Sequence, residues 1–199
     1  MLTKNELKVL KLLLNDLTGD LSIMDVAKHL NQEYVQTYLT VKCLVESGDI
    51  TLKKVGKSKI LRLDFTKSHS NYLLAEMERT NDLCRKNSLA AIVKKEILEV
   101  NQNFICILFG SQVLKPKPNS DLDLLFIIPK EYNFSEFERN IRNKLIAVNA
   151  DIVIVPESSL HEMWANPNKL NVGNELLKKH IILYGAEHFW NLRRKHHVG

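Results

Sequence analysis

Residues 121–128 read DLDLLFII, with two carboxylates at the start and only apolar side chains from Leu124 onward. Side chains alternate between the two faces of a strand, so we expect Asp121 and Asp123 on the same face. Because the rest of the segment is apolar at every position, we expect a strand buried on both sides, with its carboxylates at one edge of the sheet. Residues 151–155, DIVIV, have the same character and begin with Asp151. Neighbouring positions for the two strands would bring three carboxylates together.

Three close carboxylates repel one another, and a bound cation removes that conflict. Mg²⁺ prefers oxygen ligands, and two such ions about 4 Å apart are typical of displacement at phosphorus. The expected strand 104–109 leads into Gly110 and Ser111. The glycine allows a phosphate to approach the backbone, and the serine offers a hydroxyl and an N–H. The pattern predicts a site for two Mg²⁺ ions and a phosphate group.

The segments 109–111 (FGS), 120–125 (SDLDLL) and 151–153 (DIV) resemble the polymerase-beta-type nucleotidyltransferases, specifically the minimal nucleotidyltransferases of prokaryotes. The resemblance covers residues 89–155, and 175–187 is similar to the tail of such proteins, less specifically. It implies transfer of a nucleoside monophosphate from a triphosphate, with ATP the expected one. It implies metal binding and catalysis by Asp121, Asp123 and Asp151, and triphosphate binding by Gly110, Ser111, Ser120 and the loop residues Lys115 and Lys117.

The loop between Ser111 and Asp121 departs from the family pattern. It is one residue shorter than is common, and residues 112–115 read QVLK where many members carry an arginine and a glycine. Two interpretations therefore stay open. One is an active nucleotidyltransferase, and the other is a DNA-binding regulator whose nucleotidyltransferase domain is inactive or senses nucleotide.

The first 66 residues predict three helices followed by a hairpin. Thr3 and Glu6 form a capping box for the first helix, and the second follows Ser22. The third is expected at about 32–47. The hairpin is expected to pair 50–55 with 58–63 around a turn at Gly56. We expect the apolar positions of the third helix to face inward, namely Val35, Leu39 and either Cys43 or Leu44.

This order of elements resembles a winged helix-turn-helix module, which implies binding to double-stranded DNA. The third helix and the basic hairpin would make the contacts. The alternative is that the hairpin lysines lie on a solvated strand edge and prevent unwanted pairing with other strands. The expected DNA-contacting residues are Tyr34, Gln36, Thr37, Lys53, Lys54, Lys57 and Lys59.

The expected fold class is α+β in three parts. Residues 1–66 form the winged helix-turn-helix domain, and 67–101 form a helical connector with the first helix of the catalytic domain. Residues 102–199 form a small mixed-sheet nucleotidyltransferase domain. Within it, Ser135 and Glu138 are expected to cap a helix that follows the strand 121–128.

Composition and charge indicate where in the cell the protein is expected. The formal net charge is +5, no apolar run is long enough to span a bilayer, and the first residues lack a signal-peptide pattern. We therefore expect a cytoplasmic protein that does not enter a membrane. Similar minimal nucleotidyltransferases are the antitoxin halves of modules with a helical toxin, so a protein acceptor encoded by a neighbouring gene is expected. A homodimer stays open.

Overall fold

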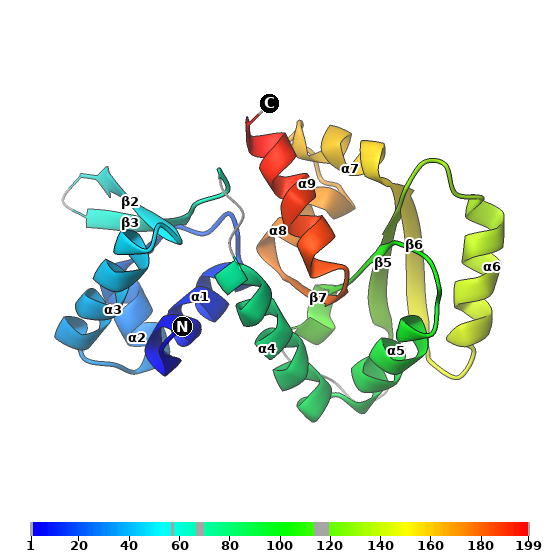
Figure 1. Cartoon of the computed structure of the whole chain (residues 1–199), viewed down its shortest axis with the longest axis horizontal. Helices are drawn as coiled ribbons and strands as arrows, with labels where there is room; N and C mark the ends of the chain where they lie inside the picture. Colours follow the sequence, from blue (N-terminus) through cyan, green and yellow to red (C-terminus); the bar gives the residue numbers. More distant parts are fainter. Residues whose placement is uncertain (1, 57, 67–69, 114–119, 199) are drawn as a thin grey trace.

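The computed structural model describes residues 2–56, 58–66, 70–113 and 120–198, and it is an α+β fold with two small sheets (Figure 1). The expected α+β fold class is thereby confirmed. The N-terminal part consists of α1 (Lys4–Asn15), β1 (Leu21–Ser22), α2 (Ile23–Leu30), α3 (Tyr34–Glu46), β2 (Ile50–Val55) and β3 (Ser58–Leu63). Its three-stranded antiparallel sheet has the order β1-β3-β2.

The beginnings of the first two helices follow from their caps. The Thr3 hydroxyl accepts from the Glu6 N–H and the Glu6 carboxylate accepts from the Thr3 N–H, which confirms the expected capping box. Ser22 and Asp25 form a second box at the start of α2. The hairpin is confirmed too, with Gly56 at a φ of 59° in its turn. These local signals act within a few residues, so the sequence reveals them.

The expected inward face of α3 is correct for Leu44 and wrong for Val35 and Leu39. Val35 and Leu39 are 69% and 55% exposed, whereas Thr37, Thr40, Val41 and Leu44 are buried. The two threonine hydroxyls donate to carbonyl oxygens one turn earlier, on Glu33 and Gln36. Because these hydroxyls are satisfied inside the helix, both threonines can be buried at little cost, while Val35 and Leu39 lie on the surface.

The C-terminal part is built on a four-stranded sheet of order β6-β5-β4-β7. Strands β5 and β6 are parallel, while β4 pairs antiparallel with both β5 and β7. Its strands are β4 (Ile105–Phe109), β5 (Leu122–Ile128), β6 (Ala150–Pro156) and β7 (His180–Tyr184). The other elements are α5 (Ser88–Leu98), the 3₁₀ helix η1 (Gly110–Val113), α6 (Phe134–Lys144), α7 (Glu157–Trp164), α8 (Val172–Lys178) and α9 (Ala186–Val198).

Helices cover both faces of this sheet. Leu124 and Phe126 pack with α5 and α6, whereas Leu125 and Ile127 pack with α7, α8 and α9. The two layers of helices are separated by the sheet in Figure 1. This alternation confirms the prediction that residues 122–128 form a strand buried on both sides. The predicted cap of α6 is wrong, because the helix begins at Phe134 and the Asn133 side chain accepts from the Glu136 N–H.

The helix α4 (Ser70–Lys86) connects the two parts and packs against both of them (Figure 1). Lys11 of α1 forms an ion pair with Asp82 of α4. On the other side of the junction, Trp190 of α9 stacks on Phe65 at a centroid distance of 5.8 Å and meets Tyr72 edge-on. The expected stiff helical connection is therefore packed along its length. Within the described ranges, we find no helix with the length and apolar character needed to cross a membrane.

Candidate functional site

The three aspartates gather at one edge of the C-terminal sheet, where the parallel strands β5 and β6 begin. Asp123 lies directly opposite Asp151 in the β5–β6 register. Asp121 comes just before β5, and its carboxylate accepts a hydrogen bond from the Asn149 side chain. The Leu122 N–H donates to the Asn149 carbonyl at 3.1 Å, which holds the two strand starts together. The predicted neighbourhood of the two strands is thus observed.

The electrostatics of this edge centre on Asp123. Asp121 and Asp151 are exposed, whereas Asp123 is half-buried. Burial raises the pKa of Asp123 above its ordinary value, and the charges of Asp151 and Asp121 raise it further. Within the described ranges no cation contributes to this shift, so the ionised carboxylate is destabilised relative to the protonated form. A cation from outside would relieve this repulsion.

Gly110 forms the neighbouring wall of the site. Phe109 of β4 pairs with Asp123 of β5, and Gly110 follows with a φ of 75°, in the left-handed region that favours glycine. A Cβ built on Gly110 would lie 2.2 Å from Asp123 Oδ2. We expected this glycine to make room for a phosphate, but here it makes room for a carboxylate. Ser111 is exposed at the start of η1, beside this carboxylate.

The ends of the predicted phosphate loop are close together. Gln112 of η1 is buried, and its side-chain amide donates to the Ser120 carbonyl at 3.2 Å. Ser120, at the end of the loop, therefore lies close to Gln112, at its start. The two lysines expected to hold the triphosphate, Lys115 and Lys117, lie outside the described residues.

The donor set consists of carboxylate oxygens, the ligands that Mg²⁺ prefers. Among the residues that the structure describes, no group of three or more His, Cys, Asp or Glu side chains is arranged to hold a metal ion. Asp123 and Asp151 face each other in register, and a site built on them would need phosphate oxygens to complete the shell. Mg²⁺ in nucleotide sites is commonly held in this way, by one or two carboxylates and the substrate phosphates.

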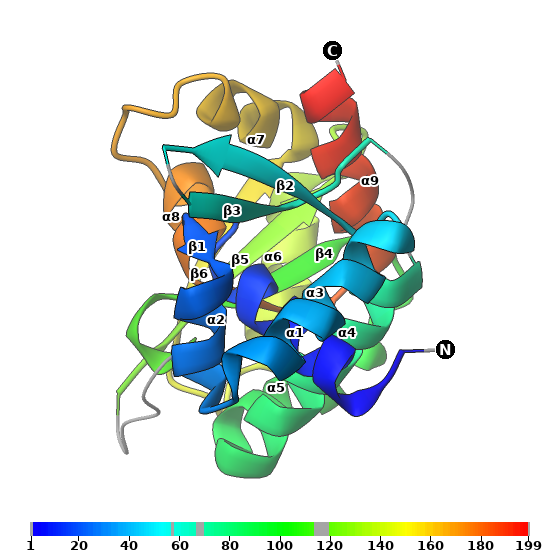
Figure 2. The ribbon, with the colours of Figure 1, turned by 90° about the vertical axis from the view of Figure 1, so that its left-hand side faces the viewer.

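The expected DNA-contacting residues belong to α3 and to the hairpin of β2 and β3, whose ribbons are drawn in Figure 2. Tyr34 and Gln36 of α3 are exposed, as are Lys53, Lys54 and Lys59 of the hairpin. Lys57 lies outside the described residues. A surface hollow of about 350 Å³ joins the two elements, and it is lined by Ser22, Ile23, Met24, Tyr34, Tyr38, Ser58 and Lys59. The Tyr34 and Tyr38 rings stack at a centroid distance of 6.4 Å.

Thr37 does not belong to this surface, and its assignment to DNA contact is wrong. Its side chain is fully buried, and its hydroxyl donates to the Glu33 carbonyl at 3.1 Å. The error has the same cause as the wrong inward face of α3. Tyr38 of the same helix is 41% exposed and lines the hollow.

The hairpin places like charges opposite each other. Lys54 of β2 pairs with Lys59 of β3, so the two ammonium groups lie on the same face of the ribbon. Directly opposed like charges destabilise an antiparallel pair, and an anion bound between them would remove the cost. The same register places Lys53 on the opposite face.

Two features of the junction and the site were missed by sequence analysis. Asn149 holds Asp121, and its only sequence signal is its position two residues before Asp151. Arg79 of α4 is buried with Glu76 at 2.6 Å and donates to the carbonyl of His180. No local pattern reveals this second group, because His180 is about 100 residues away in the chain.

Comparisons of this chain with protein-family models, with curated proteins and with solved structures found no match.

Proposed function

We propose that the C-terminal part is a Mg²⁺-dependent nucleotidyltransferase and that the N-terminal part is a winged helix-turn-helix module that binds double-stranded DNA. The observation that carries the enzymatic proposal is the register of Asp123 against Asp151 at the start of two parallel strands, with Asp121 beside them. Burial and the charges of Asp151 and Asp121 raise the pKa of Asp123, and a bound metal ion would relieve this repulsion.

In this proposal Asp121, Asp123 and Asp151 hold one or two Mg²⁺ ions, with ATP as the expected triphosphate. The metal supplies charge stabilisation at the α-phosphate and the leaving phosphates. Asp151 is exposed and accepts the proton of the attacking hydroxyl. The hydroxyl oxygen bonds to the α-phosphorus, and the bond from that phosphorus to pyrophosphate breaks. Ser111 and Gly110 are proposed to contact the triphosphate.

The acceptor is proposed to be a protein hydroxyl. Two of the three aspartates are exposed at the sheet edge, so the candidate site is open to a large partner. A DNA-binding module on the same chain fits a protein that regulates its own gene and modifies a neighbouring product, such as a helical toxin. A cytoplasmic location is part of this proposal, and so are contacts to DNA by Tyr34, Gln36, Lys53, Lys54, Lys57 and Lys59.

Labelling tests the enzymatic proposal. The protein is incubated with α-labelled ATP, Mg²⁺ and a lysate in which the neighbouring gene is co-expressed, and the products are treated with nuclease or protease. We expect label on a discrete protein that survives nuclease. Asp121→Asn with Asp123→Asn should abolish labelling without changing the side-chain volumes. A control variant, Glu131→Gln with Glu162→Gln, removes two exposed carboxylates of the same part and should keep it.

A second candidate is a DNA-binding regulator with an inactive or nucleotide-sensing domain. The observation that favours it is the loop after Ser111, which is one residue shorter than the common family pattern and reads QVLK at residues 112–115, without the arginine. The two candidates differ in one outcome. A regulator would bind ATP or DNA but leave no label on any acceptor with any triphosphate, whereas label confined to nuclease-sensitive material would identify a nucleic-acid acceptor.

A further inference from the structure

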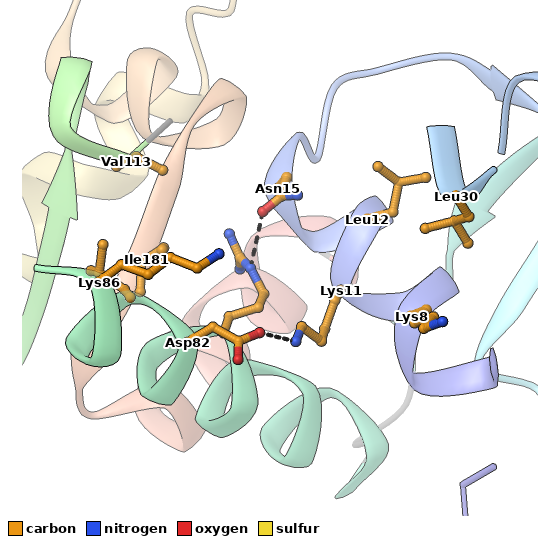
Figure 3. A pocket seen from close by; sticks show the side chains of 11 residues that line it. Lys8, Lys11, Leu12, Asn15, Leu30, Asp82, Lys86, Val113 and Ile181 are labelled. Carbon is orange, nitrogen blue, oxygen red and sulfur yellow. Dashed lines mark hydrogen bonds and ion pairs between the residues drawn. The ribbon is translucent and has the colours of Figure 1, made fainter. Parts of the chain in front are cut away.

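A pocket of about 340 Å³ lies between the N-terminal and C-terminal parts, away from the aspartates (Figure 3). Lys8, Lys11 and Leu12 of α1 lie on one side of it, and Lys86, Val113 and Ile181 lie on the other. This volume is within the range of small-molecule sites. The pocket is lined by Lys8, Lys11, Leu12, Asn15, Leu30, Arg79, Asp82, Leu83, Lys86, Val113 and Ile181.

The lining carries uncompensated positive charge. Four of its side chains are cationic and one, Asp82, is acidic. Asp82 is already used, because it pairs with Lys11 inside the pocket and with Arg85 outside it. Arg79 is neutralised by Glu76 at 2.6 Å. Neither Lys8 nor Lys86 has an ion-pair partner in the part of the chain that the structure describes, and the two lie on opposite sides of the pocket (Figure 3).

The rest of the lining is apolar. Leu83 and Ile181 are buried, while Leu12, Leu30 and Val113 are partly exposed to the pocket and its mouth. Arg79 forms part of the pocket wall. It is held in position because its guanidinium also donates to Asn15 at 3.2 Å and to the His180 carbonyl. An apolar lining with a few converging charged groups is the usual composition of a site for an organic ligand.

We propose that this pocket binds a small organic phosphate with a flat apolar body, of the size of a nucleoside monophosphate. Its phosphate is held by Lys8 and Lys86, and its body lies against Leu12, Leu83 and Ile181. The site is distinct from the aspartate edge and needs no metal ion. Val113 lines the pocket and ends η1, whose first residue, Gly110, touches the site of Asp123. A ligand here would therefore lie one short helix away from the candidate active site and would bridge both parts of the chain.

Binding of AMP to the full chain in EDTA tests the proposal, with calorimetry as the measurement. We expect AMP to bind without metal, and inorganic phosphate and adenosine each to bind at least about tenfold more weakly, because each keeps only half of the contacts. Lys8→Ala with Lys86→Ala should weaken AMP binding about tenfold or more. Lys4→Ala with Lys95→Ala changes the net charge equally on exposed positions outside the pocket and should leave the affinity unchanged.

The aspartates separate this site from the proposed active site. Asp121→Asn with Asp123→Asn should leave AMP binding in EDTA intact, even if it abolishes Mg²⁺-dependent ATP binding. Loss of AMP binding in that variant would overturn the proposal, and so would equal affinity for phosphate and AMP or equal losses in the two lysine variants. AMP should also raise the Tm of the unmodified protein and should not raise the Tm of the Lys8→Ala, Lys86→Ala variant. This result would support the proposal independently.

Discussion

The junction between the two parts of the chain and the edge of the C-terminal sheet each hold a carboxylate that is at least partly buried, and they differ in the charges beside it. At the junction, Glu76 is fully buried and burial raises its pKa to about 7, yet Arg79 lies 2.6 Å away and opposes the rise. At the sheet edge, the charged neighbours of Asp123 among the described residues are Asp151 and Asp121, and both raise its pKa further.

This difference indicates that the carboxylate at the junction has a structural role and that the carboxylates at the sheet edge form a candidate binding site. The buried carboxylate of Glu76 already has a counter-charge, an arginine whose guanidinium is itself bound to His180 and Asn15. The crowded carboxylates at the sheet edge have no cation beside them among the described residues, and a bound cation would relieve their repulsion. We therefore expect opposite responses when one charge is removed from each place, and the predictions below test this contrast.

The largest effect should follow from Glu76→Gln. The substitution leaves the Arg79 charge buried without a counter-charge, which typically costs about 3 kcal/mol of unfolding free energy or more. Urea unfolding measures the loss. Glu78→Gln removes a charge from the same helix at a partly exposed position and should cost less than about 0.5 kcal/mol. Equal losses in the two variants would show that the Glu76–Arg79 pair is not the structural element we describe.

Two glycine substitutions sharpen the description of the sheet edge. Gly110→Ala and Gly56→Ala each force a side chain into a left-handed backbone, at φ values of 75° and 59°. Both should lose roughly 1–2 kcal/mol of stability for that reason. Only Gly110→Ala also drives a Cβ against the Asp123 carboxylate, since a Cβ at Gly56 meets nothing within 4 Å. We expect Mg²⁺-dependent ATP binding to fall in the first variant alone, and a similar fall in both would contradict the geometry.

Asp123→Asn should stabilise the protein, in contrast to Glu76→Gln. The folded-state pKa of Asp123 is raised, so the unfolded state loses the proton more readily and the charged form costs stability at neutral pH. The gain should therefore be full above the folded-state pKa and shrink as the pH falls toward the ordinary aspartate value. We expect a Tm increase of about 1–3 °C at pH 7 without metal. A Tm scan over pH measures it, with Glu131→Gln, which removes an exposed carboxylate of the same part, as the control.

The smallest effect is expected at the hairpin, where the like charges are positive. Lys54→Gln removes the repulsion between Lys54 and Lys59 and should stabilise the N-terminal sheet by about 0.3 kcal/mol at low salt, and by less at high salt. In the same variant the salt dependence of duplex DNA binding should flatten by about 0.9 in log–log slope. Lys42→Gln on α3 breaks a pair with Glu46 and should not stabilise. Stabilisation in both variants would mean that net charge, not the opposed pair, is responsible.

Local signals in the sequence were sufficient for the three helices and the hairpin of residues 1–66 and for the strands β4, β5 and β6. The caps at Thr3 and Ser22 and the turn at Gly56 act over three or four residues, so they are readable without the fold. The apolar run 124–128 predicted a strand buried on both faces, because consecutive strand residues point to opposite faces of a sheet. The sequence also placed Asp121, Asp123 and Asp151 at the starts of strands.

Only the tertiary structure decided which residues meet. The sequence could not give the parallel register that sets Asp123 against Asp151, because backbone pairing between distant strands leaves no local pattern. It gave the wrong face of α3 and the wrong role for Thr37, since a threonine that bonds within its helix can be buried while valine and leucine stay exposed. The packing of the two parts decides two further features. They are the pairing of Glu76 with Arg79 next to His180, and the pocket between α1 and α4. That packing is a property of the whole chain, because it brings together residues that are far apart in sequence.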